Sequence, residues 1–186
     1  MRKPTTVSAL SDFGRVRLSR SFFMRDFLFS DIASVHGLNN VPDDPELAIA
    51  AGTRLCDELL EPLQVAFGRI AIRSAYRSSE VNGFGNEMQR AGKSGYSCAS
   101  NESNYAGHIW DWRDKNGHMG ATACVVVPAF WDRFRRTATG RSSPGGSTTI
   151  CPTQAFTSSP PTGPSTSPGT SSPSAGSTAM RHRRAA

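Results

Sequence analysis

A change of composition after Phe134 limits what this chain can fold into. Residues 135–186 number 52, and 34 of them are Ser, Thr, Pro or Gly. A segment of that composition has too little apolar surface to offset the entropy lost when a chain becomes ordered. We therefore expect the folded part of the molecule to end near Phe134 and residues 135–186 to form a disordered tail.

The charges change at the same place. The chain has 21 Lys and Arg against 15 Asp and Glu, a formal net charge of +6, and the tail alone holds six Arg and no acidic residue. The rest of the chain is therefore neutral. Because the excess positive charge lies in the tail, it indicates no nucleic-acid surface on the folded part, and we expect no nucleic-acid partner.

The sequence also argues against a membrane protein and a zinc finger. It contains no run of about 18 apolar residues, so we expect no membrane partner. The first 11 residues hold two basic residues but no apolar segment of a secretory signal. We therefore expect synthesis in the cytoplasm and reduced cysteines, with release to the cell wall by another route if the protein acts there. The four cysteines form no CxxC pair, which is the usual zinc-finger spacing.

Local patterns predict helices first and strands later. Residues 1–20 are polar and basic and are interpreted as a flexible arm. Ser30 is a suitable N-cap for a short helix ending at Gly37, and Asp44 with Pro45 begins a longer helix that reaches about Leu63. The remaining predictions are strands over residues 70–76 and 121–127, a long loop over residues 83–107, and a helix that begins at Pro128.

A candidate site follows the predicted loop. His108 and Asp111 are close in sequence, and imidazole and carboxylate groups both bind zinc. The same two residues also fit a structural interpretation, in which the histidine pairs with or caps a nearby group. Arg77 lies in a predicted turn, where an arginine is usually a surface charge, and His118 lies among turn residues.

The order of several motifs resembles the zinc D-alanyl-D-alanine carboxypeptidases, metallopeptidase family fifteen, of the C-terminal-domain type. The similarity covers residues 20–134. Its parts are Ser30-x-x-Ala33-x-x-His36-Gly37-Leu38-Asn39-Asn40-x-Pro42, Leu55-Cys56-x-x-Leu59-Leu60-Glu61-Pro62-Leu63, Phe67-Gly68-x-Ile70-x-Ile72-x-Ser74-x-Tyr76-Arg77-Ser78 and Val81-Asn82. The resemblance implies an α+β fold, with N-terminal helices packed on a small, mainly antiparallel sheet.

The resemblance also implies a chemistry. In that family a His, an Asp and a second His hold a zinc ion, and a Glu near the last His is the general base. It implies zinc as cofactor, a peptidoglycan peptide of the D-Ala-D-Ala type as substrate, His108 and Asp111 as metal ligands, and Arg77 as the catalytic residue that positions the substrate's developing negative charge. The family spacing is His-x6-Asp, however, and here it is His-x-x-Asp. An alternative alignment places the family glycine on Gly120 and Cys124 where the Asp belongs, and His118 also stays open as a replacement ligand.

The second His and the Glu are missing from the tail, whose one histidine is His182 and which has no Trp or Glu. One explanation is a genuine disordered segment. The other is a shifted reading frame, because synonymous codons allow residues 138–171 to encode, one base out of frame, a Trp-rich segment that ends in W-H-E. As written, the chain offers two of three zinc ligands, so we expect little or no peptidase activity. The alternatives are a non-catalytic peptidoglycan-binding module and a non-functional frameshift product.

Overall fold

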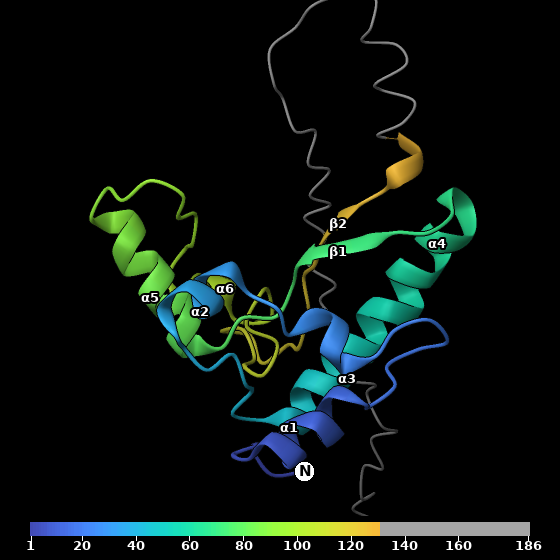
Figure 1. Cartoon of the computed structure of the whole chain (residues 1–186), viewed down its shortest axis with the longest axis horizontal. Helices are drawn as coiled ribbons and strands as arrows, with labels where there is room; N and C mark the ends of the chain where they lie inside the picture. The colour runs from blue at the N-terminus through green and yellow to red at the C-terminus, as the bar shows by residue number, and fades with distance from the viewer. Residues whose placement is uncertain (131–186) are drawn as a thin grey trace, which may run out of the picture.

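The structure is a computed structural model that describes residues 1–130, and its fold is α+β (Figure 1). The predicted disordered tail, residues 135–186, lies outside the described residues. The helices are α1 (Val7–Gly14), α2 (Asp31–His36), α3 (Pro45–Leu55), α4 (Glu61–Phe67), α5 (Ser79–Arg90) and α6 (Asn101–Asn104), and the strands are β1 (Ala71–Ser74) and β2 (Cys124–Val126). No helix among residues 1–130 has the length and apolarity needed to cross a bilayer.

The two strands form a small antiparallel sheet, as predicted. Ala71 pairs with Val126 and Ile72 with Val125, and the register then shifts so that Ser74 pairs with Cys124. In the view of Figure 1 the sheet lies between α4 and the group formed by α2, α5 and α6, and α5 contacts both α2 and α6. The sheet therefore connects the two helical parts of the molecule.

The long helix predicted from Pro45 is present, and it is interrupted once. Asp44 caps α3 by accepting hydrogen bonds from the backbone N–H groups of Glu46 and Leu47. A π-helical turn over residues 56–60 then joins α3 to α4. Pro62, in the first turn of α4, has no N–H to donate and its ring crowds the carbonyl four residues earlier, which explains the wider turn. Gly68, with φ +80°, ends the helix.

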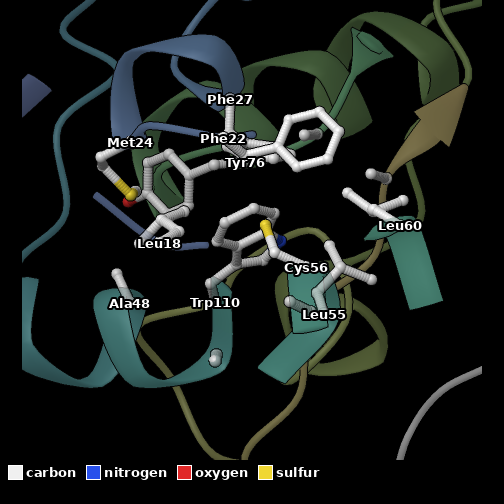
Figure 2. Packing of buried hydrophobic residues seen from close by; sticks show 14 of the residues in the cluster. Leu18, Phe22, Met24, Phe27, Ala48, Leu55, Cys56, Leu60, Tyr76 and Trp110 are labelled. Atoms are coloured by element: carbon white, nitrogen blue, oxygen red, sulfur yellow. The ribbon is translucent and has the colours of Figure 1, made fainter. Parts of the chain in front are cut away.

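The core is centred on Trp110, which is fully buried against α3 (Figure 2). Its ring centroid lies 5.3 Å from that of Phe27 and 6.0 Å from that of Tyr76. Gly52 allows the indole to approach the helix backbone, because a Cβ there would lie 2.8 Å from Trp110 Cζ3. Apolar side chains from residues 13–60 surround this centre, and Figure 2 labels Leu18, Phe22, Met24, Ala48, Leu55, Cys56 and Leu60 among them.

The expectation of a flexible arm over residues 1–20 is wrong. Thr6 caps α1 by accepting a hydrogen bond from the Ala9 N–H, and the side chains of Phe13 and Leu18 are only 0% and 3% exposed. The basic residues of this segment lie on the surface, while its few apolar side chains enter the core. These buried contacts hold the segment in place in spite of its polar composition.

The expectation of one long loop over residues 83–107 is also wrong. Helix α5 begins after Ser78, whose hydroxyl accepts a hydrogen bond from the Val81 N–H, and α6 forms four residues at Asn101–Asn104. The glycines in this segment hid the helix from the sequence pattern. Gly85 is one of them, and it is glycine because Cys98 and Ile32 pack against α5 at that position.

Candidate functional site

A cleft of about 550 Å³ lies where β1 ends, bordered by α2, the segment after α5 and the start of the His108 segment. Its lining is mixed in character and carries two arginines, one aspartate, one histidine and two cysteines. The residues that line it are Ser30, Asp31, Ile32, Arg73, Ser74, Arg77, Gly95, Ser97, Cys98, Ala99, Asn104, His108 and Cys124. The sequence therefore brings Arg77 and His108, both predicted site residues, to the same cleft.

The backbone around Arg77 is fixed from two directions. Its N–H donates to the His108 carbonyl at 2.8 Å, which joins the two predicted site residues directly. The Asn40 side chain holds the flanking residues: its amide donates to the Tyr76 carbonyl at 3.0 Å, and its oxygen accepts from the Ser78 N–H at 2.7 Å. The same amide also donates to the Leu28 carbonyl. Asn40 therefore sets the direction in which the Arg77 side chain leaves the backbone.

The guanidinium of Arg77 is half-buried, and within residues 1–130 it has no carboxylate partner. Its Nη1 donates to Cys98 Sγ at 2.6 Å, and its Nε is buried without a hydrogen-bond partner in the described part of the chain. No ion pair between Arg77 and a carboxylate occurs within residues 1–130. A cation that is partly removed from water and unpaired favours an anion in the cleft.

The imidazole of His108 is neutral. Its Nδ1 lies 2.6 Å from the Ala75 carbonyl oxygen, and because a carbonyl only accepts, Nδ1 carries the proton. Burial and the positive charge of Arg77 lower the pKa of His108 to about 4, although the hydrogen bond to Ala75 acts in the opposite direction. The Nε2 atom therefore keeps its lone pair, which is the state in which an imidazole accepts a hydrogen bond or binds a metal.

Asp111 is placed elsewhere, and its carboxylate does not line the cleft. Its Oδ2 accepts a hydrogen bond from the Asp43 N–H at 2.7 Å, and its Oδ1 is buried next to the equally buried hydroxyl of Tyr76. Burial raises the pKa of the Asp111 carboxyl, although the hydrogen bond from Asp43 acts in the opposite direction. Asp111 therefore links the segment that precedes α3 to the core. It does not lie in the cleft with His108.

Of the two alternative metal ligands, Cys124 lies in the cleft and His118 does not. Cys124 lines the cleft from β2, so it shares that cleft with His108. His118 instead lies 3.3 Å from Asp114 in a surface turn, with Nδ1 facing Oδ2. Among residues 1–130 no three His, Cys, Asp or Glu side chains come together in a way that could hold a metal ion. The described residues therefore do not form a complete zinc site.

Sequence reasoning missed Cys98 and named Asn82 only as part of a motif, although both help to build the wall of the cleft. Asn82 is fully buried on α5, donates to the Ala99 carbonyl and to Asn101 Oδ1, and accepts from the Asn104 amide. Cys98 contacts Arg77 from the same wall. The signal that could have revealed the wall is Ser78, a good N-cap residue directly before Ser79-Glu80, which marks the beginning of α5.

Comparisons of the chain with protein-family models, with curated proteins and with solved structures each give no match. The resemblance to the zinc D-alanyl-D-alanine carboxypeptidases therefore stays a prediction that rests on the sequence motifs. The geometry of the cleft is an observation that does not depend on those motifs.

Proposed function

We propose that the α+β domain, predicted over residues 21–134 and joined in the structure by residues 1–20, resembles the zinc D-alanyl-D-alanine carboxypeptidases, binds peptidoglycan peptides of the D-Ala-D-Ala type and cleaves them little or not at all. The observation that carries this proposal is the unpaired, half-buried Arg77 guanidinium beside the neutral His108 in one cleft. A peptide with a free C-terminal carboxylate supplies the missing anion.

The physical basis for binding is charge pairing in a partly dehydrated site. A guanidinium pairs with a carboxylate through charge-assisted hydrogen bonds, which are stronger than neutral ones and stronger again away from water. His108 Nε2 is an acceptor for a peptide N–H. The Ser74, Ser97 and Asn104 side chains that line the cleft supply further polar partners for a peptide backbone.

The basis for weak or absent cleavage is the incomplete ligand set. A catalytic zinc needs three protein ligands and an open position, and the described residues gather no such group. Residues 133–186 contain no acidic residue, so this segment supplies no glutamate as general base. A base gained or lost near codons 134–138 would restore a Trp-rich segment with a His beside an acid, and the same cleft would then belong to a complete peptidase.

The test is calorimetric titration with diacetyl-L-lysyl-D-alanyl-D-alanine. We expect binding that EDTA leaves unchanged, and an affinity about 10- to 100-fold lower in Arg77→Gln, because one charge-assisted contact is lost. Arg90→Gln is the matched control, since Arg90 is an exposed arginine on α5 outside the cleft. Equal affinity in wild type and Arg77→Gln would contradict the proposal. Release of D-alanine with added zinc would contradict the claim that the chain as written is inactive.

A further inference from the structure

We infer that Cys98 is a positioning residue for Arg77, whose sulfur fixes the guanidinium at the wall of the cleft. The inference rests on the proposed function in one respect, namely that Arg77 binds the ligand's anionic group. Its structural basis is the contact between Arg77 Nη1, which donates, and Cys98 Sγ, which accepts, at 2.6 Å. Cys98 lines the same cleft and is 2% exposed, so its sulfur is held among protein atoms.

Helix α5 clamps the backbone of Cys98 from one face. The Cys98 N–H donates to Gln89 Oε1 at 2.5 Å, and the Cys98 carbonyl accepts from the Asn86 amide at 2.7 Å. Both backbone groups of this one residue are therefore satisfied by side chains one turn apart on α5. The clamp leaves little freedom in where the Cys98 side chain begins.

The sulfur itself fits a space that α5 leaves by omitting a side chain. A Cβ at Gly85 would lie 2.6 Å from Cys98 Sγ and 2.9 Å from Ile32 Cδ1. Real Cβ atoms do not approach a heavy atom that closely, so any larger residue at position 85 would push the sulfur away. Gly85, Asn86 and Gln89 together place the Cys98 sulfur against Arg77.

The contact with Cys98 restricts the movement of the Arg77 side chain. A guanidinium has five N–H donors on a long, flexible stem, and ordering such a side chain opposes binding unless it is already ordered. With Nη1 held by sulfur, the guanidinium keeps one orientation before the ligand arrives. Removing the sulfur leaves the charge in the cleft but releases its orientation, so binding weakens without being abolished.

The first readout does not depend on any ligand. In nitrogen-15 NMR spectra, the Nε–H group of Arg77, assigned with Arg77→Lys, should give a distinct, slowly exchanging signal in the wild type. Cys98→Ala should broaden or lose that signal, and Cys98→Ser, which keeps an acceptor, should retain it. Gly85→Ala should act like Cys98→Ala, because it displaces the sulfur.

The second readout is the affinity for diacetyl-L-lysyl-D-alanyl-D-alanine. We expect a loss of about 3- to 10-fold in Cys98→Ala, corresponding to the cost of ordering one arginine side chain, and recovery in Cys98→Ser. An Arg77 signal that is absent from the wild type, or unchanged in Cys98→Ala, overturns the inference whatever the peptide does. If the signal responds as expected and no variant binds the peptide, the positioning role stands and the proposed function fails.

Discussion

The core around Trp110 and the cleft around Arg77 lie on neighbouring segments of one chain, yet they are held by different forces. Trp110 packs among apolar rings and helix side chains, and few of its contacts are directional. Arg77 is placed by the hydrogen bonds that it donates to His108 and Cys98, and by those that Asn40 makes to the residues on either side of it. A change in the core should therefore lower stability first, whereas a change at the cleft should alter binding or pH dependence with a smaller effect on stability.

The largest effect is expected from Trp110→Ala. The indole is fully buried and Gly52 leaves space for it, so its removal creates a large cavity and should lower the free energy of unfolding by about 3–5 kcal/mol. Trp112→Ala is the matched control, because Trp112 is 45% exposed and stacks on Tyr105 at the surface. Urea unfolding followed by far-ultraviolet circular dichroism measures both. Equal losses would contradict the placement of the core.

Asn40→Ala should lower both the stability of the fold and the affinity of the cleft for the peptide. It removes the hydrogen bonds to Leu28, Tyr76 and Ser78 and leaves buried backbone groups unsatisfied, so we expect a loss of about 2–3 kcal/mol in unfolding free energy. The peptide affinity of the folded fraction should fall as well, because the direction of Arg77 changes. Asn116→Ala, at an exposed turn, should change neither quantity. An Asn40 variant with wild-type affinity would show that Arg77 is positioned without it.

The pH dependence of stability should reveal His108. Its pKa is lowered to about 4 in the folded protein from an ordinary value of about 6.5, so the unfolded chain binds more protons between these values. The stability that His108 contributes is present above pH 6.5 and is lost as the pH falls toward 4. We expect wild type to lose about 2 kcal/mol more than His108→Gln over that interval, after allowance for partial exposure.

The Asp111 carboxyl acts in the opposite sense, since its raised pKa favours the folded state as the pH falls. The difference between wild type and His108→Gln removes this contribution, because both proteins contain Asp111. Parallel stability curves for the two proteins from pH 7 to pH 4 would contradict a buried, neutral His108.

The smallest effect is expected from Ala106→Gly. Ala106 lies two residues before His108 and has φ +56°. This left-handed conformation is energetically unfavourable for any residue with a Cβ. Replacement by glycine should relieve that strain, whereas the greater entropy of glycine in the unfolded chain opposes folding. We expect the unfolding free energy to rise by about 0.5 kcal/mol in total. Thermal unfolding measures the change. A clear loss of stability would show that the Ala106 methyl group contributes packing that outweighs the strain.

The parts of the fold that the sequence predicts well are those with local signals. Asp44 with Pro45, and Ser30 with Gly37, determine helix ends through backbone geometry and capping, and these helices are found where predicted. The strands predicted over residues 70–76 and 121–127 contain β1 and β2 of the structure. The prediction failed at α1 and α5, because the first is anchored by only a few buried side chains and the second contains glycines that long-range packing requires.

The candidate site was predictable only in part for the same reason. Arg77 and His108 were singled out by sequence motifs, and the structure brings them to one cleft. Asp111 was singled out by its spacing from His108, yet four residues of irregular chain turn its carboxylate toward Asp43. Cys98 gave no local signal, and Asn82 entered only as part of a motif, because their roles come from contacts with residues between about 17 and 22 positions away.

Whether Arg77 binds the terminal carboxylate of a peptide is decided by changing the peptide and leaving the protein intact. Diacetyl-L-lysyl-D-alanyl-D-alanine and its C-terminal amide differ in that one charge and are titrated into the same wild-type protein. We predict that the free acid binds at least about 10-fold more tightly than the amide, because only the acid pairs with the guanidinium. Equal affinities, or no binding of either peptide, would contradict the account.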